Sequence, residues 1–144
     1  MPGARTRGAR GGRSRGLLLF GQGSASSGSG ADTLAPILSG QTVGSITAEG
    51  GVPAVDTNEG RGTLWVVVVP DADVPSIAQI KAGLQSDGSA ALAAQSKQVV
   101  SPVTQTFTAV TGLAAATAYD AWFVQMDFAF NNSTAVKADF TTSA

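Results

Sequence analysis

The sequence predicts an all-β domain, a sandwich of about seven short strands, preceded by a basic arm. From residue 33 onward, turn-forming clusters recur about every ten residues, and the segments between them are rich in Val, Thr, Ile and aromatic residues. The composition also changes along the chain: nine of the 18 glycines lie before residue 33, whereas eight of the nine aromatic residues follow residue 60. We therefore divide the chain into an arm and linker, residues 1–32, and a sandwich, residues 33–144.

The strands are placed by their turn signals and by the alternation of apolar with polar residues. Strands are expected over residues 36–48, 52–57, 63–69, 98–110, 117–128 and 134–142. Residues 63–69 combine strong β propensity with apolar side chains on both faces, so they predict a central strand, which Pro70 ends. The turn over residues 131–133 joins the last two strands as a hairpin.

One short helix is expected after the third strand. The Pro-Ser pair at residues 75–76 is typical of a helix start, and Ile77, Ile80 and Leu84 then fall on one face, at positions i, i+3 and i+7. The stretch over residues 86–96 is rich in Ala, Gly and Ser. It fits either a further helical turn or a loop.

Composition excludes several classes of function. The chain has no Cys and no His, which excludes disulfides, thiol nucleophiles, Cys/His zinc sites and His-based catalytic triads. The ten carboxylates lie mostly at turns, and Asp120 and Asp127 would point to opposite faces of one strand rather than across a cleft. The sequence Asp71-Ala72-Asp73 matches only a fragment of a calcium loop. We therefore expect no enzyme, no metal and no cofactor.

Charge divides the chain in the same way as composition. Residues 1–16 hold five of the nine basic residues and no acid, whereas the other 128 residues hold four basic and ten acidic groups, a net charge of −6. Because Gly, Ser and Arg cannot bury enough apolar surface to offset the entropy of ordering, the arm alone is expected to be flexible. We expect nine residues of the arm to bind a partner: Arg5, Arg7, Arg10, Arg13, Arg15, Leu17, Leu18, Leu19 and Phe20.

The apolar run Leu17–Phe20 allows two interpretations. It could form a short strand on the sandwich of its own chain, or an anchor that inserts into a partner. The Gly-rich sequence on each side favours the anchor, because it would let the run reach away from the sandwich. A basic start followed by an apolar run also occurs in secretion signals, but four residues fall short of their usual apolar length of about 7–15.

The arginines of the arm leave two kinds of partner open. Residues 10–16, with the sequence RGGRSRG, are similar to the RGG-type segments that bind nucleic acid. No aromatic residue is interleaved before Phe20, however, and the sandwich is acidic. We therefore favour an acidic protein surface, on which Arg side chains pair with carboxylates, and keep nucleic acid as the less favoured partner.

A motif at the start of the strand expected over residues 117–128 carries a resemblance to a known family. The sequence Thr111-Gly112-Leu113, followed by Thr117-x-Tyr119, resembles the fibronectin type III domain, which is an immunoglobulin-like β-sandwich. The resemblance implies that Leu113, Thr117 and Tyr119 help to determine the fold. It also implies that Tyr119 is a corner tyrosine, whose hydroxyl group bonds to nearby backbone.

A second pair of segments refines that resemblance. Residues 62–67 and 75–83 resemble a variant of the domain found in bacterial and tailed-phage structural proteins, which carries a short helix after the third strand. Domains of this family serve in adhesins, polysaccharidases and phage virions, so the resemblance implies a fold more than a function.

The strand over residues 117–128 is expected to be apolar on both faces. If Tyr119 points inward, Trp122, Val124 and Met126 point outward, and Trp65 of the third strand joins them. Outer faces of sandwiches are normally polar. Two explanations are open, and they are compatible with each other: the expected helix covers these four residues, and they form a subunit interface, where aromatic residues and Met are enriched.

Together these features favour a non-enzymatic structural protein of a tailed-phage virion, assembled in the host cytoplasm. Within that class we expect a capsid decoration or cement protein whose arm, which can reach roughly 100 Å, binds the major capsid protein and other copies of the chain. The alternatives are a collar, tail or fibre-attached virion protein, a carbohydrate- or cell-surface-binding module, and a protein that binds nucleic acid through the arm.

Overall fold

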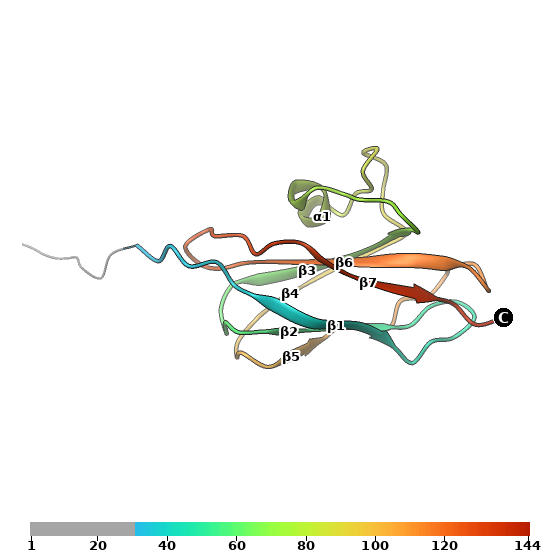
Figure 1. Cartoon of the computed structure of the whole chain (residues 1–144), viewed down its shortest axis with the longest axis horizontal. Coiled ribbons are helices and arrows are strands. Elements are labelled where there is room, and N and C mark those ends of the chain that lie inside the picture. The colour runs from blue at the N-terminus through green and yellow to red at the C-terminus, as the bar shows by residue number, and fades with distance from the viewer. Residues whose placement is uncertain (1–30) are drawn as a thin grey trace, which may run out of the picture. The chain divides into compact units, whose positions relative to one another are not determined.

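The computed structural model of the chain describes residues 31–144. The chain divides into two units, Met1–Thr33 and Leu34–Ala144. The second unit is the all-β sandwich that the sequence predicts, with two antiparallel sheets and one short helix (Figure 1). This arrangement is compatible with an immunoglobulin-like or fibronectin type III-like fold. No helix among the described residues is long and apolar enough to cross a membrane.

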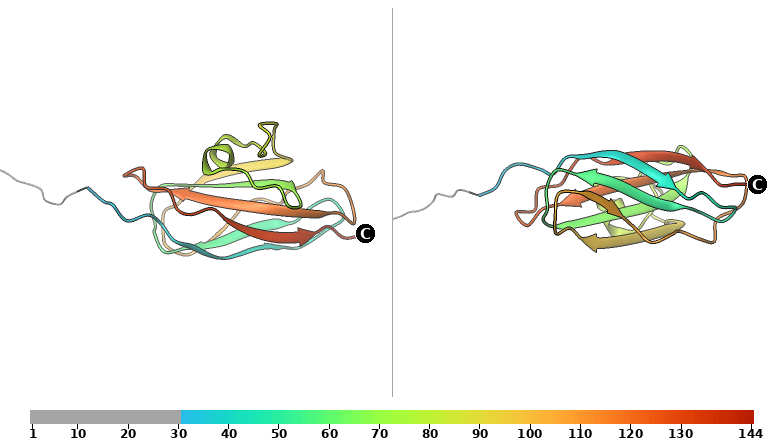
Figure 2. Two further views of the ribbon diagram at one scale, coloured as in Figure 1. Left: turned by 45° about the horizontal axis from the view of Figure 1, so that its top comes forward. Right: turned by 90° about the horizontal axis from the view of Figure 1, so that it is seen from below.

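The seven strands are distributed between a sheet of three and a sheet of four. The first sheet has the order β1-β2-β5, with β1 over Leu38–Gly44, β2 over Val52–Thr57 and β5 over Thr104–Thr106. The second sheet has the order β4-β3-β6-β7, with β4 over Ala93–Gln98, β3 over Thr63–Pro70, β6 over Ala118–Met126 and β7 over Val136–Thr141. Figure 2 shows the two sheets stacked face to face.

Strand β3 is central, as its composition predicts. It pairs with β4 along one side and with β6 along the other, and Val66 lies opposite both Gln95 and Phe123. Leu64, Val66 and Val68 point into the space between the sheets, and Val67 and Val69 point to the other face. A strand buried on both faces is almost continuously apolar, which is why this segment does not alternate.

The main core lies between the two sheets and is built from alternate residues of the strands. Fourteen buried apolar side chains form it: Leu38, Val55, Leu64, Val66, Val68, Val99, Phe107, Val110, Leu113, Tyr119, Ala121, Phe123, Ala138 and Phe140. The rings of Phe107 and Phe123 lie 6.3 Å apart between centroids, and those of Tyr119 and Phe140 lie 5.8 Å apart. Burial of these side chains supplies most of the free energy that stabilises the domain.

Helix α1, over Ile77–Ala82, lies on the outer face of the four-stranded sheet (Figure 1). It begins with a capping box, in which the Ser76 hydroxyl accepts from the Gln79 amide and the Gln79 side chain accepts from the Ser76 amide. It ends at Gly83, whose φ of 76° is readily adopted by glycine. Ile80 is its buried residue and packs on Val67, Val69 and Val124.

The predicted strand over residues 98–110 is wrong in its bounds and its continuity. The chain forms β4 earlier, ending at Gln98, and then crosses to the other sheet, where β5 is only three residues long. Pro102, which has no amide hydrogen to donate to a ladder, lies in the crossing segment. Part of the stretch expected as a helical turn or loop, residues 86–96, is therefore strand.

The edges of the two sheets are joined by side chains where β4 passes β5. The side-chain nitrogen of Gln95, Nε2, donates to the Thr108 backbone carbonyl at 2.9 Å. The side-chain oxygen of Gln95, Oε1, accepts from the Thr108 backbone amide at 3.1 Å. Lys97 Nζ donates to the Thr106 carbonyl at 3.1 Å. These polar side chains satisfy backbone groups that an exposed edge strand would leave open. They also explain why β4, which looks like a polar loop in the sequence, is a strand.

Tyr119 occupies the corner at the start of β6. Its ring is buried, and its hydroxyl oxygen accepts a hydrogen bond from the Ala114 amide at 2.9 Å. Leu113 is buried beside it in the core, and the Thr117 hydroxyl donates to the Ala115 carbonyl at 2.8 Å. The hydrogen bond between the Tyr119 hydroxyl and the Ala114 amide is the contact that the family resemblance implies for a corner tyrosine. It fixes the loop that leads into β6.

Candidate functional site

The residues of the arm that were expected to bind a partner lie outside the described residues. These are Arg5, Arg7, Arg10, Arg13, Arg15, Leu17, Leu18, Leu19 and Phe20. The candidate sites within the structure are therefore surfaces of the sandwich. They lie on the outer face of the four-stranded sheet and at the end of the sandwich where β2 and β6 finish.

The four residues expected on the outer face lie next to one another in the register. Trp65 on β3 is opposite Val124 on β6, Met126 is opposite the start of β3, and Trp122 is opposite Val67. Val124 is fully buried, because it packs under Ile80 of helix α1. Helix α1 thus covers the centre of the face, which is one of the two explanations that the sequence left open.

Trp122, Trp65 and Met126 are half-buried and are engaged within the chain. The Trp122 indole nitrogen donates to the Asp73 carbonyl at 3.0 Å, which holds the connection between β3 and α1. Lys81 lies with its Nζ 5.6 Å from the Trp65 ring centroid and 3.5 Å from Met126 Sδ. A subunit interface that uses these residues stays a prediction.

A small groove lies beside the helix. Its volume is about 210 Å³, and it is lined by Trp65, by Ile80–Gly83 of α1 and its cap, and by Ala94–Ser96 of β4. Binding pockets for drug-sized ligands usually measure about 300–1,000 Å³. The groove offers one cation, Lys81, beside the face of one aromatic ring, so it suits a short polar group rather than a buried ligand.

Asp73 belongs to the sequence that resembles a fragment of a calcium loop. Its carboxylate accepts hydrogen bonds from both the amide and the hydroxyl group of Ser86, the first of them at 3.1 Å. The side chain thereby ties the turn before α1 to the loop after it. This is a structural role, since both carboxylate oxygens are used to close the helical excursion from the sheet.

Asp120 is a fully buried carboxylate on the outer face of β6. Its Oδ2 accepts from the Ala72 amide at 3.0 Å and from Lys137 Nζ at 3.2 Å, and Lys137 Nζ also lies 2.9 Å from Asp139 Oδ1. Asp120 Oδ1 is buried and has no hydrogen-bond donor among residues 31–144. Two carboxylates thus share one ammonium group across β6 and β7, with Asp139 directly opposite Asp120.

This arrangement shifts the pKa values of Asp120 and Asp139 in opposite directions. Burial, reinforced by the neighbouring Asp139, raises the pKa of Asp120 above its ordinary value, although Lys137 and the Ala72 amide act against the rise. The hydrogen bond from Lys137 lowers the pKa of Asp139. The hydrogen bond to Asp139 and that to Asp120 raise the pKa of Lys137. Burial thus opposes ionisation of Asp120, whereas the two carboxylates stabilise the charged form of Lys137.

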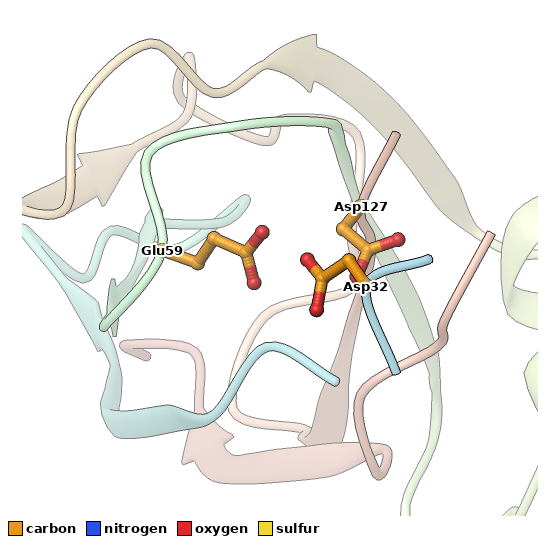
Figure 3. Close-up of side chains that lie close together, drawn as sticks. All are labelled: Asp32, Glu59 and Asp127. Carbon is orange, nitrogen blue, oxygen red and sulfur yellow. The ribbon is translucent and has the colours of Figure 1, made fainter. Parts of the chain in front are cut away.

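Another pair of carboxylates, Glu59 and Asp127, lies at the end of the sandwich where β2 and β6 finish. An oxygen atom of one carboxylate lies within 4.8 Å of an oxygen atom of the other. Figure 3 shows both side chains. Asp127 accepts from the Ala129 amide, the Asn131 amide and the Asn131 side chain, at 2.8, 2.9 and 2.8 Å. Burial raises the pKa of Asp127, but these hydrogen bonds outweigh it and lower the pKa overall. Asp127 therefore shapes the turn after β6.

Gln125 is a further buried polar residue that the sequence does not single out. Its amide nitrogen donates to the carbonyls of Glu59 and Arg61 at 3.1 and 2.8 Å, and its oxygen accepts from the Thr57 hydroxyl at 2.6 Å. It holds the loop between β2 and β3 against β6. An apolar strand interrupted by one Gln is the only sequence signal that could have marked it.

The carboxylates of Asp120 and Asp127 and the amide of Gln125 are buried, and their hydrogen bonds hold loops and the helix connection in place. No model of a protein family matches the chain, and no significant match was found among curated proteins.

Proposed function

We propose that the chain is a non-enzymatic structural protein of a tailed-phage virion, and within that class a capsid decoration or cement protein. The arm attaches it to the particle, and the sandwich is displayed on the surface. The observation that carries the proposal is the separation of charge: residues 1–16 hold five arginines and no acid, whereas the rest of the chain is acidic. Opposite charges attract the cationic arm to an anionic surface. The acidic domain is repelled by the same surface and stays in solvent.

The sandwich supports this proposal through what its polar residues do. Asp120, Gln125 and Asp127 bond to backbone amides, carbonyls or a cross-strand Lys of the domain itself. The resemblance of residues 62–67 and 75–83 to the phage variant of the domain supports the placement in a virion. The partners are the major capsid protein and other copies of the chain, and the locale is the virion, assembled in the host cytoplasm.

Binding to capsids tests the proposal. Capsids that lack the protein are prepared from the phage that encodes it and are mixed with the full chain or with a variant that lacks residues 1–20. The full chain is expected to co-sediment with capsids and the truncated variant to remain in the supernatant. Equal binding of both variants would remove the arm from the function. Binding to purified tails but not to capsids would place the protein at the collar, tail or fibres.

A carbohydrate-binding module is the second candidate, because the groove beside α1 combines the half-buried Trp65 with the polar residues Lys81 and Ser96. Aromatic rings next to hydrogen-bonding groups are the usual composition of small-molecule sites. A glycan array probed with the full chain and with Trp65→Ala tests it. Signals that disappear in Trp65→Ala would favour this candidate over the structural role.

A further inference from the structure

Exposed apolar side chains gather at one end of the sandwich. Six of the eight large apolar residues that are exposed within the described part of the chain lie there: Leu34, Ile37, Val100, Val103, Phe128 and Phe130. They come from the segment before β1, the connection from β4 to β5 and the connection from β6 to β7. These segments meet at the end of the sandwich where the described chain begins (Figure 1). We call these six residues the apolar end.

The segments that form the apolar end are held together by hydrogen bonds. Asn58 joins the loop after β2 to Ile37 through two bonds, in which Asn58 Oδ1 accepts at 2.7 Å and the Asn58 amide donates at 3.2 Å. The Asn131 side chain donates to the Leu34 carbonyl at 3.4 Å. The Val99 amide donates to the Gly62 carbonyl at 2.9 Å. The surface is therefore fixed before any partner arrives, which reduces the entropy lost on binding.

The turn after β6 presents two aromatic rings to solvent. Phe128 is 63% exposed and Phe130 is 76% exposed. Phe130 has a φ of 68°, a left-handed conformation that is strained for an aromatic residue, and the Asp127 carboxylate holds the turn through the Ala129 and Asn131 amides. A domain that holds strained backbone in order to expose Phe side chains has the features of a binding surface, where aromatic anchors carry most of the affinity.

We propose that the apolar end is the docking site for the Leu17–Phe20 segment of a second copy of this chain, so that copies link to one another. This inference rests on the proposed function only in giving the arm an anchoring role. Leu17–Phe20 is the one apolar run of residues 1–32. It has the chemistry that two exposed Phe rings and four aliphatic side chains recognise, because burial of apolar against apolar surface drives association.

Length and charge support this occupant. Thirteen residues, 21–33, separate the run from Leu34, and they can span at most about 45 Å, more than the roughly 30 Å length of the nine-residue strand β6. The linker is therefore long enough for Leu17–Phe20 to reach the end of an adjacent sandwich. Arg13 and Arg15 precede the run, and the half-buried Glu59 lies at the apolar end. An acidic side chain at the docking surface favours a segment that carries cations before its apolar run.

Two reciprocal variants of the full chain test the proposal. The arm variant replaces Leu17, Leu18, Leu19 and Phe20 with Ser and leaves the apolar end intact. The end variant carries Phe128→Ser and Phe130→Asn, the latter because Asn tolerates positive φ, and leaves the arm intact. The matched control carries Val74→Ser and Leu92→Ser, the two exposed large apolar residues that lie elsewhere. Circular dichroism and thermal unfolding verify that each variant is folded.

Sedimentation velocity over a concentration series measures the outcome. The wild type and the control are expected to self-associate equally. The arm and end variants should each associate roughly 100-fold more weakly, the effect of losing two buried anchors. An equal mixture of the two variants should regain association, because one supplies the segment and the other the surface. A monomeric wild type, an end variant that associates like wild type, or a mixture that stays monomeric would each overturn the proposal.

The failure of this inference is distinguishable from the failure of the proposed function. An end variant that binds capsids but no longer self-associates supports both ideas. A wild type that binds capsids and stays monomeric alone refutes the link between copies and leaves the capsid role intact. A wild type that self-associates through the apolar end but binds no virion component refutes the capsid role and leaves the link intact.

Discussion

Lys137 Nζ lies 3.2 Å from Asp120 Oδ2, and the Asp120 side chain is fully buried whereas that of Lys137 is 39% exposed. The ammonium group therefore enters the sheet surface from solvent and meets a carboxylate that has lost its water. Because Lys137 also binds the exposed Asp139, its charge is shared. A shared cation compensates a buried anion only in part.

Asp120→Asn is expected to stabilise the domain at neutral pH. The raised pKa means that folding favours protonated Asp120, so the stability that this group contributes is fully present below its ordinary pKa and is lost as the pH rises through the raised value. Asn removes the buried charge and still offers an oxygen to the Ala72 amide. Thermal unfolding should show a higher Tm than wild type at pH 7 and a smaller difference in acid. A lower Tm at pH 7 would contradict the assignment.

Asp139→Asn should have the opposite pH dependence. The pKa of Asp139 is lowered, so its contribution to stability is present above the ordinary pKa and is lost as the pH falls through the lowered value. At neutral pH the variant is expected to be less stable than wild type, and in acid the two should converge. The Tm of both variants over one pH series measures this, and parallel curves for Asp120→Asn and Asp139→Asn would refute it.

Gln125→Leu is expected to destabilise the domain by about 2 kcal/mol, since it removes the buried side-chain amide that donates to the Glu59 and Arg61 carbonyls and accepts from Thr57. Thr57→Val removes the hydroxyl that donates to Gln125 and also contacts the Glu59 backbone, and it should cost about 1 kcal/mol. Urea unfolding monitored by Trp fluorescence gives both values. Equal costs for the two variants would show that Gln125 does not hold the loop.

Gly62 and Gly88 form a matched pair for backbone strain. Both have positive φ, of 98° and 90°, but a Cβ on Gly62 would lie 1.9 Å from the Met126 carbonyl oxygen, whereas a Cβ on Gly88 would meet nothing within 4 Å. Gly88→Ala is therefore expected to cost about 1 kcal/mol, the cost of strain alone. Gly62→Ala should cost well above that value or prevent folding. Similar urea midpoints for the two variants would contradict the close approach of the loop to β6.

Tyr119→Phe tests the corner at the start of β6. It removes the hydroxyl oxygen that accepts from the Ala114 amide and leaves the ring packed on Phe140. The expected loss is about 1–2 kcal/mol in the free energy of unfolding. Tyr119→Ala should cost more, because it also leaves a cavity in the core. A Tyr119→Phe variant as stable as wild type would show that the corner bond does not contribute.

The parts of the fold with strong apolar signals could be predicted from the sequence. The run Thr63–Val69 is apolar on both faces because β3 is covered by the main core on one side and by α1 on the other. The helix start at Ser76 could be predicted because a Pro-Ser pair is typical of a helix start, and the structure adds that Ser76 and Gln79 form a capping box.

The parts that depend on partners far along the chain could not be predicted. Strand β4 has no apolar alternation, and it is a strand because β3 pairs with it and Gln95 joins it to Thr108. A lone Asp such as Asp120 reads as a turn residue, and only the cross-strand position of Lys137 and the approach of Ala72 make it a buried acid. Likewise the apolar end comes from three separate segments and has no signal in any one of them.

Photo-crosslinking from the arm tests the central claim most directly. A photoreactive amino acid replaces Ala9, between the arginines at positions 7 and 10, and the full chain is irradiated on capsids that it has been allowed to decorate. The account predicts covalent adducts between residue 9 and another virion protein, with the major capsid protein the expected partner. Adducts formed only with nucleic acid, or only with the sandwich of the same chain, would contradict it.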